Sequence, residues 1–331
     1  MAKAQHKVAE AKSGIVAALP RACSDETAAV EFLEAQRWAV TGPCCPHCGG
    51  VQVYQMKDRT TGERNKRFLW LCRDCGKQYT ARTGTVFEDS RIPLRHWCYG
   101  FWAAAASKKG ISSQQIQRMT GLSYKSALFM MHRIRFAMAN DFEPKPKLSG
   151  IVEADETYVG GREKNKPLSQ RNAKNLGGKG KVPVFAMVQR GGDVRSIVMD
   201  KVTMANLRKA LLGNVDLSTR IMTDSFNLYG FVGKPFARHD FVNHNAEEYV
   251  RGDVTTNTVE GVFSLLKRGL YGTFHSVSKK HLHRYLAEFD FRYNTRKFDD
   301  GERAGRLIRN ANGKRLTYAE QIGKTAEAQS A

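Results

Sequence analysis

The spacing of apolar residues changes along this chain, and the change predicts a mixed α/β protein with a helical region ahead of its sheet. Short apolar runs bounded by Gly or charged residues are typical of strands. They occur at 151–159, 182–189, 194–199 and 220–224. Leu282, Tyr285, Leu286, Phe289 and Tyr293 instead recur every three or four residues, which predicts a helix over 278–295. A second helix is expected over 256–271, and a mixed sheet with helices on its faces follows.

Helical spacing also predominates before residue 140. A helix is expected over 25–38, and Pro93 is expected to open another over 94–108. Residues 111–127 then show the pattern of a helix-turn-helix, in which Ser112 or Ser113 caps the first helix, Gly121 makes the turn and Ser123 caps the second. The outer face of the second helix is expected to carry Tyr124, Lys125, His132, Arg133 and Arg135, which suits a DNA major groove and its phosphates. The alternative is an ordinary helical hairpin with a solvated basic face.

Charge favours a polyanionic partner. The 331 residues carry a formal net charge of +21 with a sequence pI near 9.8, which favours nucleic acid first and an anionic membrane second. No apolar run approaches the roughly 18 residues of a membrane span, and no signal-peptide pattern opens the chain. A reducing compartment is therefore expected, in which cysteines serve as thiols or metal ligands.

Four cysteines stand in two C-x₂-C pairs, Cys45 with Cys48 and Cys72 with Cys75. This spacing predicts a zinc ribbon with one structural Zn²⁺, because four thiolates leave no open coordination position. Cys44 and His47 lie beside these ligands and could compete, but the spacing favours the four cysteines. The alternative is a set of unrelated thiols.

Three acidic residues lie where apolar residues or a helix start are expected. Asp155 interrupts a strand, Asp224 ends another, and Glu260 lies at the start of a helix that carries Lys267 two turns later. Three converging carboxylates repel one another unless a cation neutralises them, and oxygen ligands of this kind suit hard divalent ions. The sequence therefore predicts a carboxylate site for two metal ions. Singly, each residue could be a cap or turn residue, and Glu153 and Glu156 are expected on the opposite strand face from Asp155.

The same patterns divide the chain. We expect a flexible tail at 1–22, an amino-terminal helix and zinc ribbon at 23–82, and a helix-turn-helix-like DNA-binding region at 90–140. A catalytic domain is expected at 148–300, with a basic insertion at 160–181, and a carboxy-terminal tail at 301–331.

Several stretches, in this order, resemble a known family: CPHCGG (45–50), LCRDCGKQYTARTGTVFEDSRIPL (71–94), EADETYVGG (153–161), IMTDS (221–225), TNTVEGVFSLLKRGLYGTFHSVSKKHL (256–282) and EFDFRYNTR (288–296). They resemble the ISXO-like group of bacterial insertion-sequence DDE transposases. The resemblance implies a ribonuclease-H-like catalytic domain, with Asp155, Asp224 and a third residue of the TNTVEG motif binding Mg²⁺ or Mn²⁺. The gap after Asp224 and the position of Lys267 favour Glu260 as third ligand, and Asn257 is the second choice or a supporting partner.

The resemblance also implies an activity. It implies two-metal-ion cleavage at terminal inverted repeats and strand transfer to target DNA, by a homodimer or larger assembly in the bacterial cytoplasm, at the nucleoid. Lys267 and Arg268 are expected to hold scissile phosphates, unless they only form a solvated basic helix face. Other readings are a metal-dependent nuclease that does not join strands, a non-catalytic DNA-binding regulator, or a transposase that has lost function.

Overall fold

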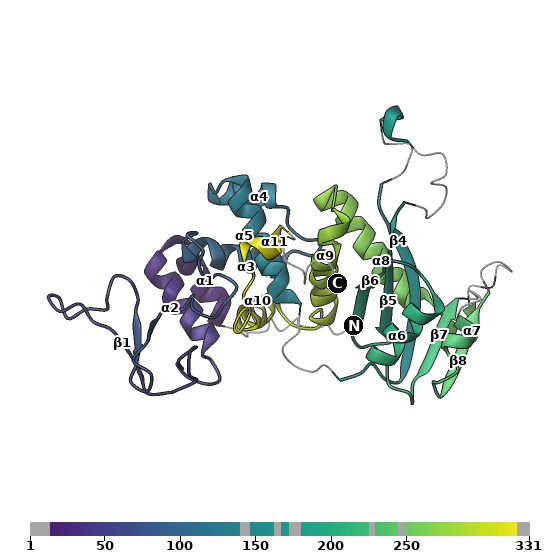
Figure 1. The fold of residues 1–331 in the computed structure, drawn as a ribbon, viewed down its shortest axis with the longest axis horizontal. Helices are drawn as coiled ribbons and strands as arrows, with labels where there is room; N and C mark the ends of the chain where they lie inside the picture. Colours follow the sequence, from purple (N-terminus) through teal and green to yellow (C-terminus); the bar gives the residue numbers. More distant parts are fainter. Residues whose placement is uncertain are drawn as a thin grey trace, which may run out of the picture. The chain divides into compact units, whose positions relative to one another are not determined.

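The chain forms two compact units in the computed structural model, which describes residues 14–139, 146–161, 167–171, 180–224, 229–243, 248 and 250–322 (Figure 1). The helical unit comprises residues 14–139 together with 295–322, so both ends of the described chain belong to it. The sheet unit comprises the described residues between 146 and 294. Among the residues described, no helix is both long enough and apolar enough to cross a membrane.

The sheet unit is built on five strands in the order β6-β5-β4-β7-β8. Their bounds are β4 Ile151–Val159, β5 Val182–Gln189, β6 Val194–Val198, β7 Arg220–Asp224 and β8 Arg238–Val242. β4, β5 and β6 form an antiparallel meander, whereas β7 and β8 run parallel to β4. This mixed sheet confirms the predicted α/β class and has the strand arrangement of a ribonuclease-H-like domain.

Helices cover both faces of this sheet because the side chains of its strands alternate between two apolar cores. Val152 and Ala154 of β4 pack in the core beneath α6 (Met204–Asn214) and α7 (Tyr229–Val232). The opposite core lies beneath α8 (Asn257–Gly269) and α9 (Leu282–Asn294) and contains Val159, Val184, Ala186 and Val188. Full burial of one such Val is worth roughly 1.5–3 kcal/mol. Odd-numbered residues of β4 therefore face α8.

Smaller elements connect these layers. A hairpin of β9 (Val250–Arg251) and β10 (Val254–Thr255), which the sequence patterns did not predict, leads directly into α8. Leu270–Phe274 extends α8 as a π-helical turn, and Lys279–His281 precedes α9 as a 3₁₀ turn. α9 therefore begins later than the expected helix over 278–295.

The helical unit combines a small ribbon with six helices that the structure describes. Its elements are α1 Gly14–Ser24, α2 Glu26–Arg37, β1 Val53–Gln55, β2 Trp70–Cys72, β3 Gln78–Tyr79, α3 Leu94–Ala106, α4 Ser113–Thr120, α5 Tyr124–Met138, α10 Asp300–Asn310 and the short α11 Tyr318–Gln321. The expected helix caps are confirmed. Ser112 Oγ accepts the Gln115 N–H at 3.1 Å, Gly121 closes α4 in the left-handed region with φ of 72°, and Ser123 Oγ accepts the Ser126 N–H at 3.2 Å.

Both expected tails need correction. Residues 14–22 lie in α1, where Leu19 and Ala22 are buried, while 1–13 lie outside the described residues. α10 packs against α3 and buries Ala304, Leu307 and Ile308, so residues 301–322 belong to the helical unit rather than to a tail. Their apolar spacing of three and four residues is that of an amphipathic helix. Most of the expected insertion at 160–181 lies outside the described residues.

Candidate active site

Strand pairing places Asp155 and Asp224 beside each other. β4 and β7 are parallel neighbours with Ile151 opposite Arg220 and Glu153 opposite Met222. Continuing this register by two residues brings Asp155 level with Asp224, the last residue of β7. The predicted adjacency of these two strands is thereby confirmed.

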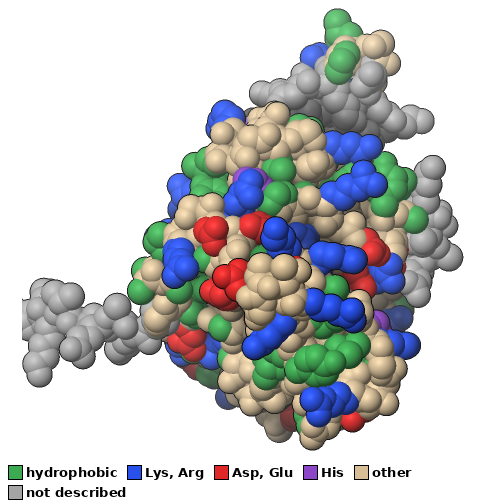
Figure 2. All heavy atoms as spheres, turned by 90° about the vertical axis from the view of Figure 1, so that its left-hand side faces the viewer, with side chains coloured by type: hydrophobic (Ala, Val, Ile, Leu, Met, Phe, Trp, Pro, Cys, Tyr) green, Lys and Arg blue, Asp and Glu red, His purple; other side chains and the backbone are tan. Residues whose placement is uncertain are grey.

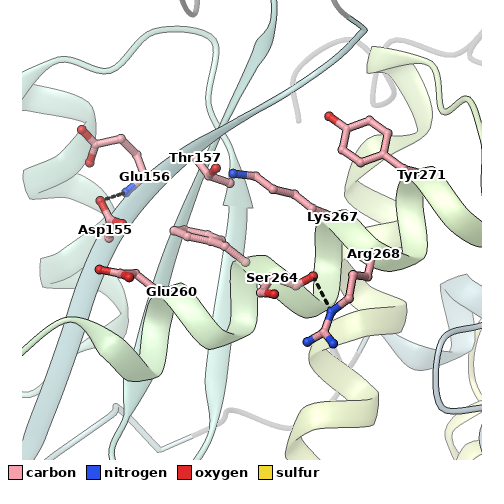
Figure 3. A pocket seen from close by; sticks show the side chains of 9 residues that line it. Asp155, Glu156, Thr157, Glu260, Ser264, Lys267, Arg268 and Tyr271 are labelled. Carbon is pink, nitrogen blue, oxygen red and sulfur yellow. Dashed lines mark hydrogen bonds between the residues drawn. The ribbon is translucent and has the colours of Figure 1, made fainter.

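Glu260 joins Asp155 from the facing helix. Both residues line an open pocket of about 730 Å³ between β4 and α8. Figure 3 shows the two carboxylates gathered at one end of this pocket. The Thr256 hydroxyl, which is buried, donates to Glu260 Oε1 at 2.9 Å and so orients that carboxylate. Asn257 is exposed and is not one of the lining residues, so the geometry favours Glu260 over Asn257.

Burial and neighbouring charges act together on Asp155. Desolvation, followed by repulsion from Asp224 and Glu156 and more weakly from Glu260, raises the pKa of Asp155 from 3.8 to about 7. The Glu156 backbone N–H opposes this change by donating to Asp155 Oδ1 at 2.7 Å. A carboxylate that is costly to ionise among other carboxylates is stabilised by a bound cation.

The carboxylates are spaced more widely than the cysteines of the ribbon. Among the described residues, the four cysteines are the only His, Cys, Asp or Glu group whose ligand atoms all lie within 4.8 Å of one another. The oxygens of Asp155, Asp224 and Glu260 are therefore not all this close. Two ions that share Asp155 suit this spacing better than one ion held by all three, and the all-oxygen donor set suits Mg²⁺ or Mn²⁺.

The other end of the pocket is basic and aromatic. Lys267 lies two helical turns beyond Glu260 and reaches from α8 toward Thr157 of β4 (Figure 3). Arg268 also lines the pocket, is exposed, and donates from Nε to the Ser264 carbonyl at 3.3 Å. One pocket thus carries carboxylates at one end and cations at the other, which is the charge pattern needed to bind metal ions and phosphate groups together.

Two residues of β4 differ from the expectation that both point away from Asp155. Glu156 does lie on the opposite strand face, where its carboxylate accepts the Tyr229 hydroxyl, and its repulsion still reaches Asp155. Glu153 was assigned to the wrong face, because residues two apart on a strand share a face. It is fully buried and binds the start of α8, a role that the sequence reasoning missed although the two-residue period could have shown the face.

The ribbon brings Cys45, Cys48, Cys72 and Cys75 together as predicted. The Sγ atoms of Cys45 and Cys75 lie 3.7 Å apart, as do those of Cys48 and Cys72. Four sulfurs at a Zn–S distance of about 2.3 Å in a tetrahedron lie about 3.8 Å apart, so the cluster fits a zinc ion. The remaining candidate, Cys44, is outside this group.

Aromatic rings surround the cysteine cluster. Trp38 and Trp70 pack edge to face with ring centroids 5.1 Å apart, and Tyr79 stacks on Trp70 at 6.3 Å. These rings belong to one apolar cluster with Cys45 and Cys72. The small ribbon therefore combines a metal-type site with its own apolar core.

The candidate DNA-binding residues of α5 divide by exposure. Tyr124 and Lys125 are exposed, and the Lys125 ammonium lies over the rings of Phe129 and Tyr318 at 5.8 and 5.5 Å. Arg133 is half-buried and donates to the Glu88 carbonyl at 3.0 Å.

The expectation for Arg135 is wrong. Its side chain has no exposed surface, and His132 is also buried, so neither lies on an outer face. α5 packs against α3, α4 and α10, and the buried Lys314 donates to the carbonyls of Ala137 and Ala139 at its carboxyl end. The face expected to meet DNA is thus partly covered by the carboxy-terminal segment. Elsewhere Lys and Arg remain spread over the surface, with smaller groups of Asp and Glu between them (Figure 2).

Comparison with known proteins gives two family matches. Residues 147–294 match the family described as ISXO2-like transposase domain, and residues 24–78 match the transposase zinc-ribbon domain. A Halobacterium salinarum protein described as "Uncharacterized protein in transposable element ISH50" is 32% identical over 277 residues, which cover 81% of this chain and 90% of that protein. This relative is archaeal, so the similarity does not indicate a bacterial source.

Two solved structures show weaker similarity. An intasome of simian T-cell lymphotropic virus in complex with PP2A regulatory subunit B56 gamma matches at 14% identity and a TM-score of 0.25, over 56% of this chain and 62% of that one. The HTLV-2 integrase catalytic core domain in complex with magnesium, in dimeric form, matches at 17% identity and a TM-score of 0.24, over 43% and 86%. The fold assignment rests on the strand order described above.

Proposed function

Because this chain belongs to the family of transposases with an ISXO2-like domain, we propose that Asp155, Asp224 and Glu260 hold the two divalent metal ions of its reaction. Family membership makes the chain a DDE-type transposase. The observation that best supports the assignment is the shared pocket of Asp155 and Glu260, together with the effect of Asp224 on the pKa of Asp155.

The proposed roles follow from position. Asp155 lies between the other two carboxylates and is the residue best placed to contact both ions, while Asp224 and Glu260 each complete one site. When bound, two such ions clamp the attacking and leaving oxygens of an in-line phosphoryl transfer. Lys267 and Arg268 bind the phosphates on either side of the scissile bond from the basic end of the pocket. No covalent intermediate with a protein side chain is required.

The helical unit supplies DNA binding in this proposal. The ribbon holds one structural Zn²⁺ on its four cysteines, and Tyr124 and Lys125 of α5 contact the terminal inverted repeats. Joining two element ends requires at least two protomers on DNA. The chain acts on Mg²⁺ or Mn²⁺, and in the compartment that holds the element, which in a prokaryote is the cytoplasm.

The test uses the zinc-loaded chain, Mg²⁺ and labelled DNA that carries the terminal repeats flanking its own genomic locus. Asp224→Asn runs beside a matched control, Asp200→Asn, which changes an exposed carboxylate that pairs with Lys279 at 3.2 Å outside the pocket. We expect cleaved and joined products from the wild type and the control, and neither from Asp224→Asn.

Each other outcome has a separate meaning. Cleavage without joined products would favour a nuclease that does not join strands. Repeat binding without any metal-dependent chemistry would contradict the proposed metal site. Products from Asp224→Asn equal to those of the control would remove Asp224 from it.

A further inference from the structure

Glu153 is a buried carboxylate that the proposed chemistry does not use. It lies on β4 two residues before Asp155, on the same strand face, and its side chain has no exposed surface. Four groups donate to it: the Thr258 N–H at 2.7 Å, the Thr258 hydroxyl at 2.8 Å, the Val259 N–H at 3.1 Å and Arg190 Nε at 2.6 Å. A buried carboxylate with this many donors fixes the groups around it, because moving any one of them leaves charge unsatisfied.

Three of these donors belong to the first turn of α8, where helices leave backbone N–H groups unpaired. The residue at the N-cap position, Thr256, makes no side-chain cap hydrogen bond. Its hydroxyl donates to Glu260 instead. Glu153 therefore caps α8 from another element, and its negative charge also suits the positive end of the helix dipole. The helix start is fastened to β4 only four residues along the chain from where β4 and α8 meet around Asp155 and Glu260.

Arg190 extends this attachment to the neighbouring hairpin. Besides Glu153, its guanidinium donates to the Asp253 carbonyl at 2.8 Å and the Thr255 carbonyl at 3.1 Å, at the end of the β9–β10 hairpin. The Asp253 carboxylate in turn pairs with Arg220 of β7, the strand that ends at Asp224. The elements that carry all three acidic residues thus meet through Glu153 and Arg190.

We propose that Glu153 is a positioning residue that sets the separation of Asp155 and Glu260 and so determines the affinity of the site for divalent ions. This inference rests on the proposed metal site. Glu153 itself touches neither the ions nor DNA. It acts through the Thr258 and Val259 backbone and holds α8 at the distance from β4 at which both carboxylates reach their ligands.

The test replaces the carboxylate without changing its volume. Glu153→Gln places an amide NH₂ among N–H donors and should loosen the start of α8. The matched control is Glu288→Gln, which also breaks a fully buried carboxylate–Arg pair in the sheet unit, with Arg292 of α9, away from the pocket. Mn²⁺ binding to the protein–DNA complex is measured by electron paramagnetic resonance, together with the Mn²⁺ dependence of end cleavage. We expect Glu153→Gln to weaken Mn²⁺ binding by about 10- to 100-fold, as loss of a ligand-orienting partner does.

Asp155→Asn separates failure of this inference from failure of the proposed function. If Asp155→Asn retains wild-type Mn²⁺ binding, the proposed metal site is wrong. If Asp155→Asn loses it while folded Glu153→Gln binds as tightly as Glu288→Gln, only the positioning role is wrong. Should Glu153→Gln fail to fold, Thr258→Val removes one donor to Glu153 and leaves the carboxylate paired. A smaller loss of Mn²⁺ affinity in Thr258→Val than tenfold supports the proposal, and unchanged affinity overturns it.

Discussion

Replacing Asp155 by Asn should stabilise the sheet unit in the absence of divalent ions while abolishing activity. Asn retains an oxygen for the Glu156 N–H and removes the charge that burial and neighbouring carboxylates oppose. Because the pKa of Asp155 is raised from 3.8 to about 7 on folding, the folded state binds a proton that the unfolded chain has released. Ionised Asp155 therefore destabilises the fold. This effect is absent below about pH 4, grows up to about pH 7 and is then constant.

The magnitude follows from the same shift. Keeping Asp155 ionised in the folded chain costs about 4 kcal/mol at pH 8 and under about 2 kcal/mol at pH 5. Relaxation around the ionised group reduces both figures, so we expect Asp155→Asn to gain about 1–4 kcal/mol at pH 8 and less at pH 5. In the wild type, Mn²⁺ should restore most of the difference, and in the variant it should have no effect.

The assay must report on the sheet unit alone. All four Trp residues, Trp38, Trp70, Trp97 and Trp102, lie in the helical unit, so Trp fluorescence is not informative here. Hydrogen exchange of β4 and β7 peptides, read by mass spectrometry without strong chelators that would strip zinc, measures local stability directly. Slowing of exchange by about 10- to 1000-fold at pH 8 is expected. An Asn variant that exchanges like the wild type at pH 8, or gains as much at pH 5, would refute the electrostatic argument.

Three further predictions concern other residues. Chelating the zinc should change the fluorescence of Trp70, which packs beside the cysteines, and leave exchange in the sheet unit unchanged; altered exchange there would show that the units are coupled. Lys125→Ala should weaken DNA binding for all sequences and lower the salt-dependence slope by about one, whereas Arg135→Ala should lower the free energy of unfolding by roughly 3 kcal/mol; a binding titration over salt and a denaturation curve separate the two. Glu260→Gln should reduce end cleavage by about 100-fold or more and Asn257→Ala by under about threefold; the reverse ranking in a cleavage assay would make Asn257 the third ligand.

Strand positions could be predicted closely because their signals are local. β4, β5 and β7 begin and end at the residues expected from their apolar runs, and Gly150 and Gly160 mark the two ends of β4. The adjacency of β4 and β7 was required by the chemistry of Asp155 and Asp224, and the observed parallel pairing satisfies it. Here a functional hypothesis supplied a long-range contact that apolar spacing alone does not contain.

The helical unit shows where this reasoning stops. Arg135 was placed on an outer face because it is charged, and a single helix does not reveal which neighbours will cover it. The covering elements include α10, whose amphipathic spacing was present in a polar segment interpreted as a tail. Lys314, 175 residues beyond the Ala139 carbonyl that it contacts, belongs to the same segment. Sequence distance of this order hides a packing partner even when both helices are recognised.

Glu153 and Asp155 show how one strand face prepares two buried carboxylates for different roles. Glu153 is surrounded by donors from α8 and Arg190, which lie 105 and 37 residues away, so its charge is satisfied within the protein. Asp155 instead lies among other carboxylates, which raises its pKa. Donors around Glu153 stabilise one arrangement of strand and helix, and that rigidity allows the repulsion at Asp155 to persist without pushing α8 away. A site that must attract cations needs both conditions, because carboxylates free to separate would relieve their repulsion by moving apart rather than by binding metal.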